Sequence, residues 1–376
     1  MLTFLKSYLL LIIFSMSIIC CKSSSTQPVV EPKKQLQVEM HDARVKSGVP
    51  ALVVASVTSD QISLAADGVR KLRDTASVTV SDFFHLGSNT KAFTGMLAAK
   101  AVDEGKIKWD TRVVDILPAL ASSMLPVYKN TTLEDLLRHR SGLPPYTTDE
   151  ELSTLPHLEG SVMEQRLELC PWVFSQPNVA VPRDTNVYSN AGYVVAATMI
   201  EQLYNRPYDD LLQEKILQPL GLQAKFGWPA YHALYQPWGH ATGQSGKLEL
   251  IDPDLPENDF PSWGTPAGNL SMNIENYSKF LQIILKAKKG GAFPLTEQSF
   301  SKIITPESGY GIGWVYVNVN GKSMLGHCGA AGGFFVCALL DFENDLAVAV
   351  FTNSDSPEIA MKMQICSLYL HDISLK

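Results

Sequence analysis

Residues 83–102 read FFHLGSNTKAFTGMLAAKAV, and this stretch carries the first structural signal of the chain. Its apolar start is typical of a short strand, and residues 93–102 are rich in helix formers, with Gly105 soon after as a stop signal. The tetrapeptide SNTK, from Ser88 to Lys91, stands where the helix should begin. Side chains three residues apart share one face of a helix, so the serine and the lysine are predicted neighbours. A helix N-terminus also adds partial positive charge and free N–H groups beside the serine.

A serine followed three positions later by a lysine suggests a nucleophile and its base. A serine hydroxyl needs a base within hydrogen-bond reach. A lysine serves only if burial or a nearby charge lowers its pKa. The apolar helix face formed by Phe93, Met96 and Leu97 offers such burial to Lys91. The alternative is that Ser88 only caps the helix and that the lysine is solvated.

A second S-x-x-K occurs at residues 299–302. It lies between Phe293-Pro294 and Thr305-Pro306, on a segment with a surface-like composition. We therefore expect Ser299 to be structural and not catalytic.

Strand signals lie at both ends of the chain, and helix signals lie in its middle. An Asn320-Gly321 pair marks a hairpin near the C-terminus. Strands are expected at residues 51–57, 61–66, 310–319, 332–340 and 346–352, and helices at residues 133–139, 191–203 and 208–217, at 276–286, and after a cap at Ser356. The predicted fold class is α+β: N- and C-terminal strands join one antiparallel sheet packed with helices, and a central helical lobe lies against it.

The tripeptide Tyr188-Ser189-Asn190 precedes the helix expected at residues 191–203. A tyrosine at this place can share a proton with Ser88 and Lys91. Asn190 can orient the lysine or hold a substrate amide. Taken alone, the motif is common and usually structural.

The tripeptide His327-Cys328-Gly329 precedes Ala330 and a further run of small residues. Glycine on a strand lets a ligand approach the backbone closely. An N–H group from this strand, together with the N–H of Ser88, would form an oxyanion hole. Taken alone, His327 is also compatible with a satisfied core histidine.

The three motifs occur in the order S-x-x-K, Y-x-N and H-x-G, about 100 and about 139 residues apart. In this order they resemble the serine β-lactamase and penicillin-binding protein superfamily. Within it they resemble the class C-like branch, which also holds esterases and D-amino-acid peptidases. The resemblance covers residues 37–371 and implies a β-lactamase/transpeptidase-like fold. Its flanking phrases are GVP at 48–50, FHLGS at 84–88, TLEDLLRH at 132–139, SGLP at 141–144, PAGNL at 266–270 and YGIGW at 310–314.

The resemblance implies a role for each matching residue. Ser88 would form the acyl-enzyme, with Lys91 as proton acceptor. Tyr188 would assist proton transfer to the leaving group, and Asn190 would contact the lysine and the substrate. The residue after the third motif, Ala330, would supply the second oxyanion N–H group, next to Gly329.

The third motif departs from the K-T-G of true β-lactamases and penicillin-binding proteins. A lysine is charged at neutral pH and attracts a substrate carboxylate, whereas His327 is mostly neutral unless its pKa is raised. Cys328 also removes the threonine hydroxyl that would bind this carboxylate. In this respect the chain is similar to the esterases and peptidases of the family.

The expected activity is therefore that of a serine hydrolase that transfers an acyl group to water. Its substrate would be a small ester, a D-amino-acid amide or a peptidoglycan-like peptide, and β-lactam turnover would be weak or absent. The proline-rich residues 143–187 are expected to wall the cleft. Two alternatives stay open: a class C-like β-lactamase, and a lipoprotein that binds cell-wall peptides without hydrolysing them.

The N-terminus resembles a bacterial lipoprotein signal. Lys6 precedes an apolar run at residues 9–19, which is too short to span a bilayer and ends at Cys20-Cys21 before a Ser-rich stretch. We expect a signal peptide at residues 1–20, a flexible tether at 21–36 and a hydrolase domain at 37–376. Lipidation of Cys21 would anchor the protein to a bacterial membrane, in the periplasm or at the cell surface. The alternative is an ordinary signal peptide with incidental cysteines.

Charge and cysteine content exclude several classes of protein. The net charge of −7 without a basic cluster argues against a nucleic-acid partner. No His/Asp/Glu cluster has metal-ligand spacing, so no metal and no cofactor are expected. The remaining cysteines are expected to be isolated thiols, although a disulfide with unassigned partners is possible; they are Cys170, Cys328, Cys337 and Cys366.

Overall fold

The computed structural model of the chain describes residues 32–233, 235–255, 261–306, 309–319 and 321–375. The predicted signal peptide at residues 1–20 and the predicted lipidation site Cys21 lie outside the described residues. Helix α1 (Pro32–Ser47) includes the last residues of the segment expected to be a tether. Leu36 and Met40, one helical turn apart, bury this helix against the sheet, whereas Val38 and Val45 are exposed.

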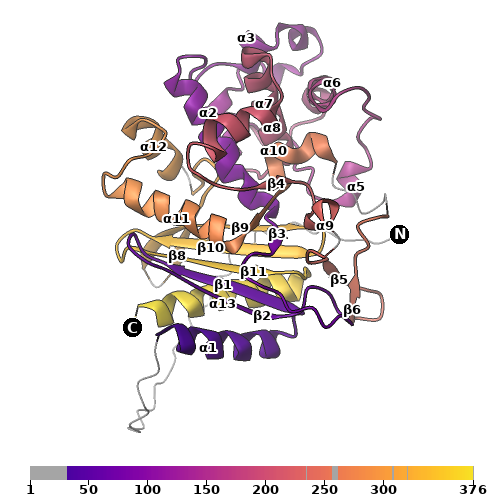
Figure 1. Cartoon of the computed structure of the whole chain (residues 1–376). Coiled ribbons are helices and arrows are strands. Elements are labelled where there is room, and N and C mark those ends of the chain that lie inside the picture. The colour runs from indigo at the N-terminus through magenta and orange to yellow at the C-terminus, as the bar shows by residue number, and fades with distance from the viewer. Residues whose placement is uncertain (1–31, 234, 256–260, 307–308, 320, 376) are drawn as a thin grey trace.

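A six-stranded antiparallel sheet forms one layer of the molecule (Figure 1). The strand order is β2-β1-β11-β10-β9-β8, so strands from the two ends of the chain lie side by side. This confirms the predicted α+β fold with one sheet built from N- and C-terminal strands. The strands are β1 (Ala51–Val57), β2 (Ile62–Gly68), β8 (Val315–Val319), β9 (Lys322–Ala331), β10 (Phe334–Asp341) and β11 (Leu346–Thr352).

Both faces of this sheet are covered, which explains why its central strands are apolar at nearly every position. Along β1, Val53 and Ala55 join the main core, whereas Leu52 and Val54 join a second cluster. The second cluster lies beneath α1 and the C-terminal helix α13 (Pro357–Ser374), which cover the outer face (Figure 1). As predicted, Ser356 caps α13, because its side chain accepts a hydrogen bond from the backbone of Ile359.

The inner face carries the helical lobe (Figure 1). Its central helices, α2 (Thr90–Asp103) and α7 (Asn190–Tyr204), are buried on nearly all sides. Such helices carry apolar residues on every side, and most residues of both helices are apolar. The other helices are α3 (Val113–Ile116), α4 (Leu133–Leu137), α5 (Asp149–Leu152), α6 (Val162–Ser175), α8 (Tyr208–Leu212), α9 (Pro229–His232), α10 (Thr265–Gly268), α11 (Ile274–Lys288) and α12 (Glu297–Ile304).

Two smaller sheets complete the fold. Strand β3 (Phe83–His85) pairs with β7 (Leu270–Asn273), which also pairs with β4 (Lys225–Phe226). The third sheet is the hairpin of β5 (His240–Thr242) and β6 (Leu248–Leu250). Through the pairing of β3 with β7, the segment before Ser88 lies beside the chain that follows α10.

One local expectation needs correction. The helix predicted at residues 208–217 is α-helical only as far as Leu212 and continues as a π-helical turn, Gln213–Leu217. The proline-rich stretch 143–187 contains a full helix, α6, with Pro171 inside it. Ser161 caps α6 through a capping box with Glu164, a signal that the density of prolines obscured.

The expectation of isolated thiols is wrong for two cysteines, because Cys328 and Cys337 form a disulfide. They are direct partners in the β9–β10 register, with Cα atoms 4.1 Å apart. This distance is short enough for a cross-strand bridge. Cys170 and Cys366 are free. The pairing follows from strand register, which the cysteine spacing does not reveal.

Candidate active site

The nucleophile candidate Ser88 lies at the junction of the two layers. It belongs to a short 3-10 turn, η1 (Gly87–Asn89), between β3 and α2. Gly87 has a φ of +51°, and a Cβ atom there would lie 2.6 Å from the backbone nitrogen of Ala330. Only glycine accommodates both this backbone conformation and this close approach. The sharp turn presents a half-buried Ser88 side chain at the start of α2.

Lys91 points back toward Ser88, as the three-residue spacing predicts. Its Nζ atom lies 3.2 Å from Ser88 Oγ, and the residue has no exposed surface. Burial holds the pKa of Lys91 well below its usual range. No carboxylate among the described residues forms an ion pair with it. A buried lysine without a counter-ion is suited to be a neutral amine, which is the form that can accept a proton.

Two oxygen atoms fix the direction of this amine. Lys91 Nζ donates to Asn190 Oδ1 at 2.7 Å and to the backbone carbonyl of Ala267 at 2.5 Å. A neutral amine has two N–H bonds and one lone pair. With its two protons on these oxygens, the lone pair faces Ser88 Oγ. The sequence predicted Asn190 as a lysine partner but assigned no role to Ala267, since a backbone carbonyl leaves no trace in a sequence.

Tyr188 covers the other side of the lysine. Lys91 Nζ lies 4.7 Å from the centre of the Tyr188 ring. Burial raises the pKa of Tyr188 above its usual value, and a hydrogen bond with Ser88 opposes this shift only in part. At neutral pH Tyr188 is therefore a phenol that shares hydrogen bonds with Ser88, not a phenolate.

The start of α7 positions Tyr188 and Asn190. Ser189 caps this helix by accepting from Gly192 N, and its hydroxyl donates to the carbonyl of Pro144. The side-chain amide of Asn190 donates to the carbonyl of Tyr146 at 2.9 Å. The first residues of the proline-rich stretch thus hold the start of α7 in place beside the site.

His139 is a site residue that the sequence analysis did not single out. Its ring packs 4.3 Å from the Tyr188 ring, and its Nδ1 atom accepts from the backbone N–H of Ser189 at 3.1 Å. Burial holds the pKa of His139 well below its usual range, so the ring is neutral. It supports the tyrosine from behind. In the sequence it is the last residue of a predicted helix and of the phrase TLEDLLRH at 132–139.

The third motif supplies the opposite wall. A Cβ atom at Gly329 would lie 2.5 Å from the backbone nitrogen of Ser88, so β9 packs directly on the turn that holds the serine. The first N–H groups of a helix have no partner within it. The backbones of Ser88 and Ala330 therefore belong to two segments in direct contact, and an oxyanion hole between them stays a prediction.

His327 lies beside the site and is neutral. Its Nδ1 lies 2.8 Å from the carbonyl oxygen of Cys328, which can only accept, so Nδ1 carries the proton. Its Nε2 then accepts from the hydroxyl of Tyr310 at 3.0 Å. Burial and the nearby Lys91 lower the pKa of His327 to about 3. At neutral pH the third motif therefore provides no fixed positive charge beside the site. The Cys328 side chain is committed to the disulfide.

The second S-x-x-K does not take part in the site. Ser299 is buried in α12, and its hydroxyl donates to Asp103 Oδ1 at 2.6 Å. Lys302 pairs with Glu134 at 2.6 Å. Both side chains join α12 to neighbouring helices, as expected for a structural pair.

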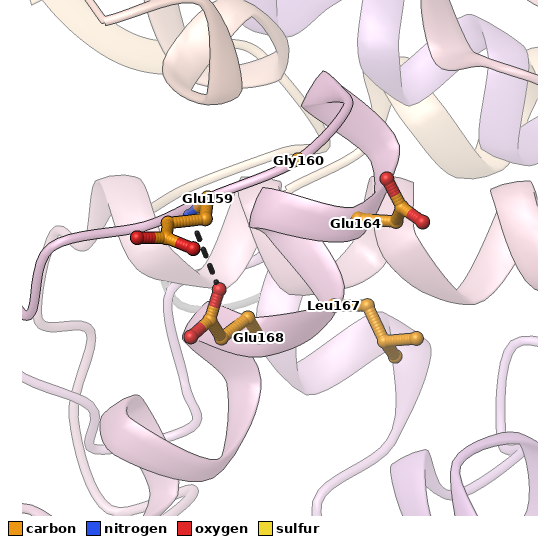
Figure 2. A pocket seen from close by; sticks show the side chains of 5 residues that line it. All are labelled: Glu159, Gly160, Glu164, Leu167 and Glu168. Atoms are coloured by element: carbon orange, nitrogen blue, oxygen red, sulfur yellow. Dashed lines mark hydrogen bonds between the residues drawn. The ribbon is translucent and has the colours of Figure 1, made fainter.

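Three further observations concern a metal site, membrane-spanning helices and a hollow on the surface. No group of three or more His, Cys, Asp or Glu side chains within the described ranges could hold a metal ion. None of the helices placed by the structure is long and apolar enough to cross a membrane. Figure 2 shows an open acidic hollow on α6, which includes none of the predicted site residues; it is lined by Glu159, Gly160, Glu164, Leu167 and Glu168.

Comparison with known proteins gives consistent matches along most of the chain. The family model described as Beta-lactamase matches residues 34–364. Penicillin-binding protein 4 of Amycolatopsis lactamdurans is 26% identical over 332 residues, which is 84% of each chain. The unguisins hydrolase ungD' of Aspergillus campestris is 28% identical over 306 residues. That match covers 76% of this chain and 55% of the relative, so the chain spans about half of its length.

Solved structures match the same fold. The octameric penicillin-binding protein homologue from Pyrococcus abyssi superposes with a TM-score of 0.73 at 21% identity, over 90% of this chain and 77% of that chain. The crystal structure of SurE gives a TM-score of 0.71 at 20% identity, over 91% of this chain and 76% of that chain. At these identities the likeness shows a shared fold.

Proposed function

The chain belongs to the beta-lactamase family and is a serine hydrolase of that superfamily, and we propose that it acts through an acyl-enzyme on a D-amino-acid peptide or amide, or on a small ester. One observation carries the proposal. Lys91 is fully buried without a carboxylate partner among the described residues, and its Nζ lies 3.2 Å from Ser88 Oγ. This is the arrangement of a nucleophile with a neutral amine as its base.

The reaction follows from the geometry. Ser88 Oγ attacks the carbonyl carbon of the substrate as its proton passes to Lys91 Nζ. The N–H groups of Ser88 and Ala330 stabilise the oxyanion that forms. Tyr188, which is a phenol hydrogen-bonded to Ser88, lies where it can relay the proton to the departing amine or alkoxide. Water then attacks the acyl-enzyme by the reverse proton path and releases the acid.

The edge of β9 favours a peptide-like substrate. Strand β8 pairs with β9 only as far as Gly326, opposite Val315. The next residues, from His327 to Ala331, pair with β10 on one side, and no strand among the described residues pairs with their other edge. The face of this stretch at Gly329 packs on the turn of Ser88. An extended amide can add to such an edge by main-chain hydrogen bonds. A small ester would use only the oxyanion hole.

A class C-like β-lactamase is the second candidate, and the third motif weighs against it. The neutral His327 offers no fixed charge to the carboxylate of a β-lactam. We therefore expect slow acylation by such compounds. A non-hydrolytic binding protein, the third candidate, has no need of a lysine base, yet the S-x-x-K pair and Tyr188 are intact.

The test is intact-mass spectrometry of the full chain after reaction with a fluorophosphonate probe. It is paired with turnover of p-nitrophenyl acetate and of D- and L-alanine p-nitroanilide. We expect one adduct and hydrolysis, both lost in Ser88→Ala, and preference for the D-amide over the L-amide. Rapid turnover of a chromogenic cephalosporin would favour the lactamase. Absence of any adduct in the wild type would favour the binding protein and overturn the mechanism.

The location of the protein is a separate proposal. The apolar run at residues 9–19 and the cysteine that follows it support a lipid anchor on Cys21. Expression in a bacterial host with labelled palmitate should mark the wild type and not Cys21→Ser. Incorporation of label into Cys21→Ser but not into Cys20→Ser would move the anchor to Cys20.

A further inference from the structure

A buried ion pair lies in the helical lobe, outside the site described above. Arg166 on α6 and Glu201 on α7 are 1% and 0% exposed, and Arg166 Nη1 donates to Glu201 Oε1. Burying two charges costs several kcal/mol of desolvation unless further hydrogen bonds satisfy them. The other contacts of the pair therefore indicate what it does.

Arg166 holds the chain that leads into α10. Its Nε atom donates to the carbonyl of Trp263 at 3.0 Å, and its Nη2 atom donates to the carbonyl of Ser262 at 3.3 Å. These residues form a 3-10 turn, Ser262–Gly264, directly before α10. The guanidinium thus fixes the entry of this short helix relative to α6 and α7.

Glu201 reaches the same helix by a second route. Its Oε1 atom accepts from the backbone N–H of Tyr208 at 2.8 Å. The Tyr208 hydroxyl lies 2.6 Å from Thr94 Oγ1, which donates to the carbonyl of Pro266 at 2.7 Å. The threonine has a single hydroxyl proton, so the tyrosine must be the donor of the first bond. Tyr208 therefore links Glu201 to Thr94, and Thr94 in turn holds the carbonyl of Pro266.

Both routes end beside the lysine base. Arg166 fixes the residues before α10, and Thr94 fixes the carbonyl of Pro266 within it. The next carbonyl, that of Ala267, is the acceptor 2.5 Å from Lys91 Nζ. α10 also contacts the nucleophile turn, since a Cβ atom at Gly268 would lie 3.5 Å from the carbonyl carbon of Gly87.

We propose that Arg166 and Glu201 are positioning residues that hold α10, and with it the Ala267 carbonyl, in the place that aims Lys91 at Ser88. The inference rests on the proposed role of Lys91 as base. A displacement of about 1 Å at a catalytic group lowers rates by up to about 100-fold. The pair therefore acts on the chemical step without touching the substrate.

The first test replaces the pair by neutral side chains, as Arg166→Met/Glu201→Gln. The glutamine keeps an oxygen for Tyr208 N. Asp209 loses its 3.6 Å ion pair with Arg166, but its side chain keeps 37% exposure to water. We expect the acylation rate by the fluorophosphonate probe to fall by about 10- to 100-fold. The KM for p-nitrophenyl acetate should change little. The acidic limb of the pH–acylation profile should shift to higher pH by about one unit. A looser α10 lets water reach Lys91, and this reduced burial raises the pKa of the lysine.

The second test breaks only the far route and leaves the ion pair intact. Thr94→Val has the shape of threonine without its hydroxyl, whereas Thr94→Ser keeps the hydroxyl. The valine variant should show the same fall in rate and the same shift of the limb, and the serine variant should recover most of the rate. Combined with Arg166→Met/Glu201→Gln, the valine change should add less than the product of the separate effects, because both act through α10.

The control is a buried pair in the other layer of the molecule. His371 Nε2 lies 3.0 Å from Asp341 Oδ2, and both side chains are less than 5% exposed. His371→Gln should lower thermal stability without moving the pH limb, which separates positioning from general destabilisation. An unreactive wild type would refute the proposed function. A reactive wild type whose Arg166 and Thr94→Val variants keep its rate and pH limb would overturn the positioning role alone.

Discussion

Gly329 approaches Ser88 so closely that a Cβ atom at position 329 would lie 2.5 Å from the serine nitrogen and 2.2 Å from the carbonyl oxygen of Leu86. Both of these atoms belong to the backbone of the nucleophile turn. Backbone atoms cannot move aside for an added Cβ atom as the end of a flexible side chain can. The glycine therefore sets the distance between β9 and the turn that holds Ser88, the two segments of the proposed oxyanion hole.

Gly329→Ala is expected to separate these walls and to lower the acylation rate by about 100-fold or more, the magnitude of losing one oxyanion donor. The measurement is the rate of adduct formation with the fluorophosphonate probe. Gly321→Ala is the control: Gly321 has a positive φ, which Gly329 does not, so the change strains the local backbone, but no neighbour lies within 4 Å of the added atom. Equal rates in wild type and Gly329→Ala would contradict the assignment of the oxyanion hole.

Asn190→Asp is expected to raise the pKa of Lys91. The substitution places a carboxylate where an amide oxygen now lies 2.7 Å from the ammonium position, and this favours the protonated amine. Because the reaction needs the neutral amine, acylation at pH 7 should fall by about 10- to 100-fold and recover at higher pH. Asn190→Ala should lower the rate without this upward shift. Two superimposable pH profiles would argue that Lys91 is not the base.

Stability should decline in mild acid because of buried neutral histidines. In His240, Nδ1 lies 2.6 Å from the carbonyl of Asn353, and Nε2 accepts from the backbone N–H of Leu72. Burial lowers the pKa of His240 to about 4. An unfolded histidine titrates near about 6.5, so the unfolded chain takes up the proton first as the pH falls. Folding stability on the order of 3 kcal/mol is then lost between about pH 6.5 and pH 4.

The measurement is the melting temperature against pH for the wild type and His240→Gln. The variant should be less stable at pH 7.5 and should show a shallower decline between pH 6.5 and pH 4. His157→Gln is the control, because the His157 side chain is 88% exposed. Parallel curves for wild type and His240→Gln would show that another group governs acid sensitivity.

The disulfide between Cys328 and Cys337 should be detectable by thiol counting. In the segment of residues 37–376, unfolded without reductant, iodoacetamide should label Cys170 and Cys366 only. Labelling of all four cysteines should require prior reduction. Cys328→Ala/Cys337→Ala should lower the unfolding free energy by about 2–3 kcal/mol, the loop-closure value for a bridge of this span. Four labelled thiols without reductant would refute the bridge.

The sequence by itself predicted the candidate catalytic residues and the arrangement of strands and helices in layers. The three motifs pointed to Ser88, Lys91 and Tyr188 because their order and spacing together resemble one family, although each motif alone is weak. The apolar runs at both ends of the chain identified the strands of the main sheet, because a sheet covered on both faces leaves little room for polar residues. These signals are local, and each can be read without knowing what lies across from it.

Only the tertiary structure decided the contacts that join distant segments. The acceptor role of Ala267 depends on a backbone carbonyl, and the support from His139 depends on how its ring packs on Tyr188. The pairing of Cys328 with Cys337 depends on strand register. Neither residue type nor spacing predicts these contacts, because each forms between two segments that meet only after the chain has folded.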